Sequence, residues 1–110
     1  MSKYLSEKCV IDGITFDSLF EGNRYRELKL LERAGKISDL EVHKKFALIQ
    51  KSRWGRTINY EADFVYFDRE KNGYVVEDTK SSYTQKLPVY RLKKRLFQEL
   101  YDMDITEIIK

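Results

Sequence analysis

Hydrophobic and polar positions alternate with the two-residue period of β-strands in several stretches of the chain. The first stretch, 10–16, turns at Asp12-Gly13, a pair favoured in two-residue hairpins. The polar segment 51–56, between the expected strands 37–50 and 58–68, is predicted to form a loop or hairpin tip. The longer expected strands are 37–50, 58–68 and 74–80, and a short one follows at 105–109.

Two other stretches repeat with the 3.6-residue period of helices. In the first, Asp17 or Ser18 can cap the start, and the helix should run to about Ala34, with Gly35 as a typical stop. The second should begin at Pro88, which suits a first helical turn. The stripe expected on the first helix comprises Glu21, Tyr25, Leu28 and Leu31. The expected core face of the second comprises Val89, Leu92, Leu96, Phe97 and Leu100.

The order of these elements predicts a single α/β domain spanning residues 1–110. Hairpin, helix, three strands, helix and strand assemble most simply as a mixed β-sheet flanked by helices. The 110 residues are enough for one core, which 8 Tyr and 6 Phe can fill. The polar segment 81–86 is expected to be a mobile connection to the second helix.

Composition excludes several classes of protein. Cys9 is the only cysteine, so an intramolecular disulfide and a cysteine-based zinc site are both ruled out. No apolar stretch approaches the roughly 20 residues of a membrane span, and residues 1–8 lack the apolar run of a signal peptide. We therefore expect a cytoplasmic protein without a membrane partner. The formal net charge of +3 decides nothing about other partners.

Two acidic residues fall on strands that the Asn72-Gly73 turn would pair. Asp63 lies on the first and Asp78 on the second, so their carboxylates can converge across the roughly 4.8 Å between neighbouring strands. Such a pair suits Mg²⁺, which prefers oxygen ligands. Lys80 should share a face with Asp78, whereas Glu77 should point to the other face. We therefore take Asp78 as the second acid, with Glu77 as the alternative.

The acid pair and its lysine resemble the motif of the PD-(D/E)xK nuclease superfamily. Asp63, followed by Asp78-x-Lys80, comes after a helix that carries Glu21. The element order also resembles the core of that superfamily. Most of the chain, from Val10 to Ile109, resembles a phage and prophage family usually left as a domain of unknown function. The residues that carry this second resemblance are 12–18, Glu21, Arg24-Tyr25, Leu28, 62–66 and 90–96.

The resemblance implies a restriction-endonuclease-like fold and a metal-dependent endonuclease acting on DNA. Asp63 and Asp78 would hold Mg²⁺ or Mn²⁺, with the backbone carbonyl of Thr79 as a third protein ligand and without an organic cofactor. Glu21 would hold a second ion or orient a metal-bound water, although it can also serve only as a helix cap. Lys80 would stabilise the pentavalent phosphate rather than act as a base, because nearby carboxylates keep it charged.

Two positions depart from the patterns of these families. Ala62 stands where the superfamily often has proline. Gly22 stands where the phage family would have alanine, and glycine inside a helix costs roughly 1 kcal/mol relative to alanine. Close approach of a neighbouring element would explain this glycine.

Basic residues gather in two segments that we interpret as a DNA-binding surface. Residues 44–58 contain five Lys or Arg and no acid, and residues 80–99 contain six against Glu99. Trp54 can either stack on an exposed base or pack on the sheet. No base-reading pattern stands out, so we expect selectivity for branched DNA, by analogy with Holliday-junction resolvases of the superfamily. The expected DNA contacts are Lys44, Lys45, Arg53, Trp54, Arg56, Lys86, Arg91, Lys93 and Lys94.

Other functions stay open on the sequence alone. The chain can be a nucleic-acid-binding module without catalysis, a protein-interaction protein that keeps only the fold, or the nuclease subunit of a larger recombination or transposition assembly. A homodimer would suit a junction resolvase, because resolution needs two cuts. We assign no role to His43, which we expect at the surface. The preferred DNA structure, DNA against RNA, the number of metal ions and the oligomeric state are not determined.

Overall fold

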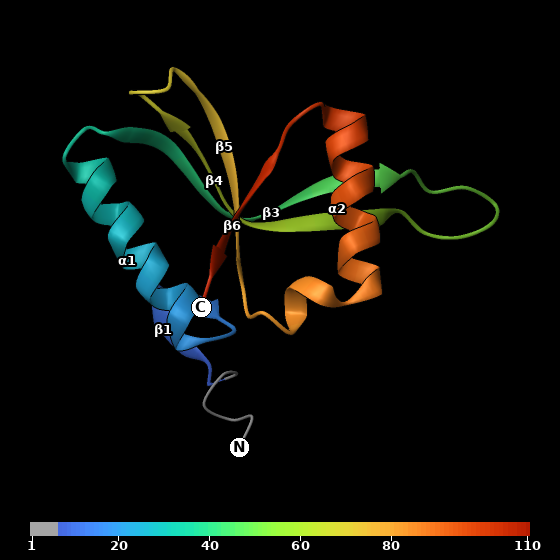
Figure 1. The fold of residues 1–110 in the computed structure, drawn as a ribbon, viewed down its shortest axis with the longest axis horizontal. Helices are drawn as coiled ribbons and strands as arrows, with labels where there is room; N and C mark the ends of the chain where they lie inside the picture. Colours follow the sequence, from blue (N-terminus) through green and yellow to red (C-terminus); the bar gives the residue numbers. More distant parts are fainter. Residues whose placement is uncertain (1–6) are drawn as a thin grey trace.

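Four strands form the central sheet of the computed structural model, which describes residues 7–110 (Figure 1). The elements are β1 (Cys9–Ile11), β2 (Ile14–Phe16), α1 (Leu19–Arg33), β3 (Ile37–Ile49), β4 (Ile58–Asp68), β5 (Gly73–Lys80), the 3₁₀ helix η2 (Thr84–Lys86), α2 (Pro88–Tyr101) and β6 (Ile105–Ile109). The sheet order is β3-β4-β5-β6, with β6 parallel to β5 and the other pairs antiparallel. A separate hairpin, β1-β2, precedes it. The predicted α/β layout, a mixed sheet with flanking helices, is confirmed.

Local signals in the sequence set the hairpin turn and the start of α1. Asp12 and Gly13 both have positive φ angles, 53° and 77°, as a tight two-residue hairpin turn requires. Ser18 caps α1, because its Oγ accepts a hydrogen bond from the backbone N–H of Glu21 at 3.1 Å. In return, Glu21 Oε1 accepts one from the backbone N–H of Asp17 at 3.1 Å. These bonds satisfy N–H groups at the helix start and fix one end of the Glu21 carboxylate.

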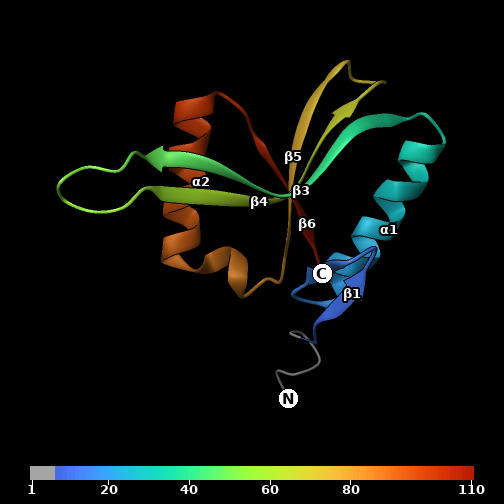
Figure 2. The same ribbon diagram turned by 180° about the vertical axis from the view of Figure 1, so that it is seen from behind.

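The two long helices cover opposite sides of the sheet (Figures 1 and 2). On one side, α1 and the β1-β2 hairpin pack against the sheet around Leu28 and Phe64, which are fully buried. On the other side, α2 packs with the fully buried Phe97 against Tyr60 and Val76. Burial of these apolar groups in two layers stabilises the domain.

Near the middle of strand β4, the even-numbered residues change from facing α2 to facing α1. Tyr60 and Ala62 pack with α2, whereas Phe64 packs with α1, although regular alternation would keep all three on one face. The neighbouring strand β3 is also irregular at this level, because His43 has a left-handed backbone with φ 56°. Asp63 lies between Ala62 and Phe64, at the point on β4 where this change occurs.

The predicted core face of α2 is wrong for most of its residues. Val89, Leu92 and Leu100 are 66%, 60% and 58% exposed, and of the predicted set only Phe97 is fully buried. The helix instead turns Phe97 toward the aromatic rings of β3 and β4, together with Tyr90. The helix carries apolar residues around more than one face, and the ring partners on the sheet decide which of them is buried.

One smaller expectation differs from the structure. Leu31, expected in the buried stripe of α1, lies at the surface. The segment 81–86, whose mobility stays a prediction, contains η2, and Ser81 Oγ accepts a hydrogen bond from the backbone N–H of Thr84 at 3.0 Å. In residues 7–110 no helix is both long and apolar enough to cross a membrane.

Candidate metal centre

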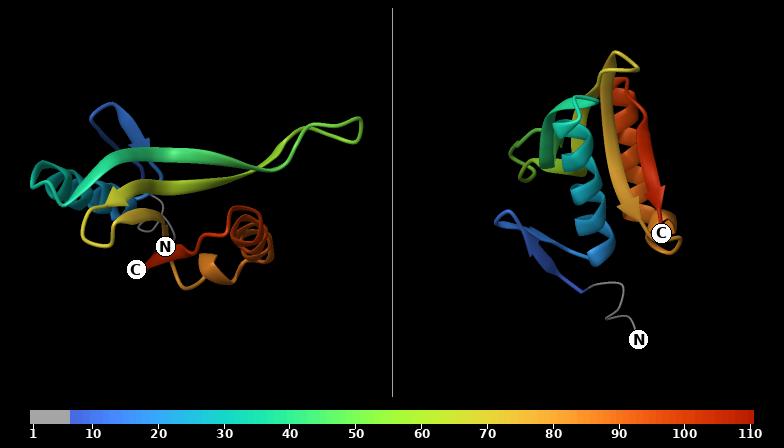
Figure 3. Two further views of the ribbon diagram at one scale, coloured as in Figure 1. Left: turned by 90° about the horizontal axis from the view of Figure 1, so that it is seen from above. Right: turned by 90° about the vertical axis from the view of Figure 1, so that its left-hand side faces the viewer.

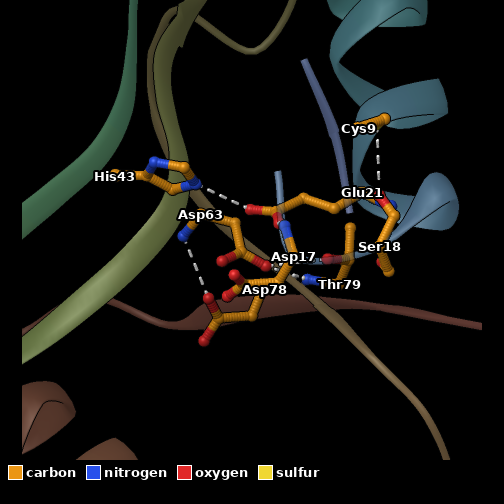
Figure 4. A network of polar contacts seen from close by, with 8 residues as sticks. All are labelled: Cys9, Asp17, Ser18, Glu21, His43, Asp63, Asp78 and Thr79. Carbon is orange, nitrogen blue, oxygen red and sulfur yellow. Dashed lines mark hydrogen bonds and ion pairs between the residues drawn. The ribbon is translucent and has the colours of Figure 1, made fainter. Parts of the chain in front are cut away.

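Glu21, His43 and Asp63 lie close together beside the sheet (Figure 4). They come from α1, β3 and β4, and each offers one ligand atom within 4.8 Å of the other two. Divalent cations bind oxygen and nitrogen ligands at about 2.0–2.6 Å. Three donor atoms at this spacing can therefore surround a single ion.

The Glu21 carboxylate is buried beside a second negative group. Its side chain is only 4% exposed, and Oε2 lies 3.0 Å from His43 Nε2. Burial, and next the negative charge of Asp63, raise the pKa of Glu21 to about 7. Two acids at this distance repel one another unless a positive charge or a proton lies between them.

His43 is a site residue that the sequence reasoning missed. Instead of lying free at the surface, its side chain is 31% exposed and its ring contacts Glu21. The ring also lies 5.6 Å from the ring of the buried Phe16. The alternation of β3 carried no sign of this position, because the left-handed backbone at His43 alters where the side chain points.

Asp63 is held in place by the residue that follows Asp78. Its Oδ2 accepts two hydrogen bonds from Thr79, one from the backbone N–H at 2.8 Å and one from the hydroxyl at 2.8 Å. We expected Thr79 to serve through its backbone carbonyl. The contacts instead show that the backbone N–H and hydroxyl of Thr79 position the carboxylate of Asp63 on the neighbouring strand.

Asp78 lies directly behind Asp63 and is fully buried. Its Oδ1 accepts a hydrogen bond from the backbone N–H of Asp63 at 3.1 Å, and its Oδ2 accepts one from the Tyr60 hydroxyl. Burial raises the pKa of Asp78 to about 6, and the charge of Lys80 acts against this rise. Asp78 is thus next to the three-residue cluster but is not one of its members. Each of its oxygens keeps a second lone pair that can accept a further partner.

Lys80 stands on the same side of β5 as Asp78. Its Nζ lies 4.6 Å from the centre of the Tyr90 ring on α2, a distance typical of a cation–π contact. The Tyr90 hydroxyl donates to Glu107 on β6 at 2.6 Å. Nothing in the sequence indicated that Tyr90 and Glu107 lie near Lys80, because only the packing of α2 and β6 brings them beside the lysine.

Glu77, the alternative motif acid, has different partners. Its two oxygens accept hydrogen bonds from Arg24 Nε at 2.9 Å and Arg24 Nη2 at 2.6 Å, and one also accepts from the Tyr66 hydroxyl. The side chain is 1% exposed, on the α1 side of the sheet. This carboxylate is committed to a buried ion pair, so of the two neighbouring acids only Asp78 contacts Asp63.

The expected DNA contacts differ in whether their charge is already paired with an acid and in how exposed the side chain is. Lys44 pairs with Glu41 at 3.2 Å, and Lys94 pairs with Glu107 at 3.3 Å. Lys93 is half-buried. The exposed members of the expected set are Lys45, Arg53, Trp54, Arg56, Lys86 and Arg91. Since Trp54 is 82% exposed, the reading in which it packs on the sheet is wrong.

The whole chain, residues 1–110, matches the model of a family described as a protein of unknown function, DUF1064. The chain belongs to the DUF1064 family. No curated protein and no solved structure matches it significantly.

Proposed function

We propose that this DUF1064 protein is a metal-dependent nuclease that hydrolyses phosphodiester bonds, with DNA as its substrate. The observation that carries the proposal is the meeting of Glu21, His43 and Asp63 within 4.8 Å, from three separate elements. A chain gains no stability from gathering two acids in a half-buried place. A divalent cation at this point would offset that repulsion.

The donor set fits such a cation. Two carboxylates and one imidazole supply oxygen and nitrogen ligands, and Asp78 lies close behind them. Mg²⁺ prefers oxygen ligands alone, whereas later divalent metals bind imidazole more strongly. We therefore favour Mn²⁺ over Mg²⁺ as the ion held by Glu21, His43 and Asp63. A bound cation supplies a polarised water and neutralises charge on the scissile phosphate.

The surrounding residues would position these groups and stabilise charge. Thr79 fixes the rotamer of Asp63, and Tyr60 fixes that of Asp78. Lys80 presents a positive charge beside the acids, and we assign it the stabilisation of the extra negative charge that develops on the phosphate. We place this activity in the cytoplasm, where Cys9 stays reduced.

Cation binding and cleavage test the proposal separately. Calorimetric titration with Mn²⁺ should show binding to the wild-type protein, strongly reduced binding to Asp63→Asn, and unchanged binding to Glu61→Gln. Glu61 is the matched control, because it is an exposed acid on the same strand. Cleavage of a synthetic four-way junction and of linear duplex should require Mn²⁺ and be lost in Asp63→Asn and Asp78→Ala. Cleavage that persists in both variants would remove the nuclease proposal.

A nucleic-acid-binding protein without catalysis is the second candidate. The exposed Trp54 and the cations beside it favour nucleic-acid binding whether or not the acids act. This candidate predicts salt-dependent DNA binding with neither Mn²⁺ binding nor cleavage. A nuclease subunit of a larger assembly would instead bind Mn²⁺ and cleave DNA only with its partners present.

A further inference from the structure

The hairpin formed by β3 and β4 carries its turn far beyond the body of the domain (Figure 3). We call residues 51–56 the arm tip. Ser52 and Gly55 close it with two hydrogen bonds between their backbones, at 3.0 and 3.2 Å. Arg53 and Trp54 therefore occupy the two corners of a tight turn, and the backbone N–H of Trp54 donates to Ser52 Oγ at 3.1 Å. The tip is a built structure that presents two side chains outward.

The indole of Trp54 is exposed to solvent, although tryptophan is normally well buried. Trp54 is 82% exposed, and its one contact of note is the Arg53 guanidinium, 4.4 Å from the ring centre. A cation stacked on one face leaves the other face of the ring available. The core of the described chain does not use this ring, so its place at the tip needs another explanation.

The charge around the ring indicates the chemistry of the partner. Lys51, Arg53 and Arg56 all lie at the tip and are exposed, and residues 44–58 contain no acid. Positive charge favours a polyanion, and an aromatic ring favours a flat, unsaturated partner. A nucleic acid with an unpaired base offers both, whereas the bases of an intact duplex are already stacked on one another.

We propose that the arm tip binds nucleic acid by stacking Trp54 on an unpaired base, while the neighbouring cations contact the flanking phosphates. The inference rests on the proposed function only in its choice of ligand. It specifies the DNA substrate of the proposed nuclease as DNA with unstacked bases. The contact is sequence-tolerant, because every base has a π face. Binding at the tip does not need the metal centre.

Trp54 is the only tryptophan of the chain, so its fluorescence reports on the arm tip alone. The titration uses the whole protein, a chelator to prevent cleavage, and three probes: single-stranded DNA, a four-way junction with an unpaired base at its branch, and blunt linear duplex. Quenching should occur with the first two probes and be weak with the third. Equal quenching by polyglutamate would show that the tip binds polyanions or acidic proteins without using a base, and would overturn the proposal.

Variants separate stacking from general attraction to DNA. By anisotropy of labelled single-stranded DNA, Trp54→Ala should weaken binding roughly 5- to 150-fold, the range expected for loss of one base–aromatic stack. Trp54→Phe should restore part of the affinity. Tyr74→Ala is the control, because Tyr74 is 57% exposed and lies outside the two basic segments. Unchanged affinity in Trp54→Ala, or an equal loss in Tyr74→Ala, would refute stacking. Mn²⁺ titration of the same variants should match wild type, so the two proposals fail independently.

A different observation carries a second inference. Val89, Leu92 and Leu100 of α2 are all more than half exposed and lie on one face of the helix, whereas Leu96 packs against the core. The stripe is about 17 Å long, from the 1.5 Å rise per residue of a helix. An apolar stripe of this length on a helix is typical of a protein contact rather than of a DNA contact.

The charges on α2 favour a second copy of this chain as the occupant. The first part of the helix carries Arg91 and Lys93, whereas its end is followed by the acids Asp102 and Asp104. Lys94 and Arg95 already pair with Glu107 and Glu99 of the same chain. Two copies paired antiparallel about a two-fold axis would place the basic part of one against the acidic end of the other. We infer that α2 forms such a homodimer contact. One helix pair falls below the about 800 Å² per partner of a standard interface, so the dimer should be weak.

Sedimentation over a range of protein concentrations tests this contact. The wild-type protein should dimerise at high micromolar concentration, and Leu92→Glu should remain monomeric. Leu30→Glu is the matched control, because Leu30 on α1 is 61% exposed against 60% for Leu92. A wild-type protein that stays monomeric throughout, or a Leu30→Glu variant that loses the dimer equally, would overturn the inference.

Discussion

Arg24 of α1 donates two hydrogen bonds to Glu77 of β5, at 2.9 and 2.6 Å. Arg24 is three residues after Glu21, and Glu77 is directly before Asp78. The ion pair therefore joins the helix that carries one acid of the site to the strand that carries another. Because an arginine fork has a fixed geometry, the pair sets the position of α1 along β5 as well as its distance.

Removal of Arg24 should destabilise the fold strongly. In Arg24→Ala the Glu77 carboxylate, 1% exposed, would be left without its cation, and breaking a buried pair in this way costs about 3–5 kcal/mol. Urea denaturation measures the loss. Arg26→Ala, an exposed arginine on the same helix, should change stability by less than about 0.5 kcal/mol. A similar small effect for both variants would show that the pair does not hold α1 in place.

His43 should determine which cation the centre prefers. In His43→Ala the nitrogen ligand is lost and two carboxylates remain, so affinity for Mn²⁺ should fall more than affinity for Mg²⁺. Calorimetry with each ion gives the two ratios. His43→Asn, which keeps a polar side chain and tolerates the left-handed backbone, is the structural control. If both ions lose affinity equally in His43→Ala, the imidazole is not a ligand.

The metal-free protein should become less stable as the pH rises from about 4.5 to about 7. The pKa of Glu21 is raised to about 7 in the fold, chiefly by burial, from its ordinary value of 4.5. In that window the folded state holds a proton that the unfolded chain has released, so stability falls with rising pH, by up to about 3 kcal/mol. The raised pKa of Asp78 adds an effect of the same sign at lower pH.

Denaturation midpoints in a chelating buffer at mildly acidic and mildly alkaline pH measure this dependence. Glu21→Gln removes the titrating group and should flatten the profile, since the amide oxygen can still accept the hydrogen bond from Asp17. Added Mn²⁺ should also flatten it, because a cation replaces the proton beside the carboxylate. A wild-type profile that rises over the same window would contradict the burial of an uncompensated acid.

Gly22 should couple energetically to Cys9. A Cβ at this position would lie 2.5 Å from Cys9 Sγ and 3.2 Å from Ile11 Cδ1, so the expected close approach of a neighbouring element is real and is made by β1. Gly22→Ala alone should destabilise the packing of the hairpin on α1. In a Cys9→Ala background the same change should cost less, or even stabilise by up to about 1 kcal/mol through helix propensity. A double-mutant cycle gives the coupling. Additive effects would show that the contact relaxes freely.

The elements of this fold depend on short-range chemistry that the sequence displays. Asp12-Gly13 predicted the hairpin turn, Ser18 with Glu21 predicted the start of α1, and Pro88 predicted the first turn of α2. The period-2 rule also assigned Asp78 and Glu77 to opposite faces, in agreement with their separate partners. Each of these inferences needs only the residue and its near neighbours along the chain.

The site and the helix faces depend on contacts between residues far apart in sequence. His43 joins the acids because its backbone leaves the regular strand conformation, which no alternation pattern reveals. The face that α2 buries is chosen by the rings of Phe46 and Tyr60, not by its own count of leucines. The sequence by itself determined the elements, their order and the three acids Glu21, Asp63 and Asp78 as candidates. Only the tertiary structure decided which side chains meet, because a local period fixes the relative directions of neighbouring residues but not the partner that each direction reaches.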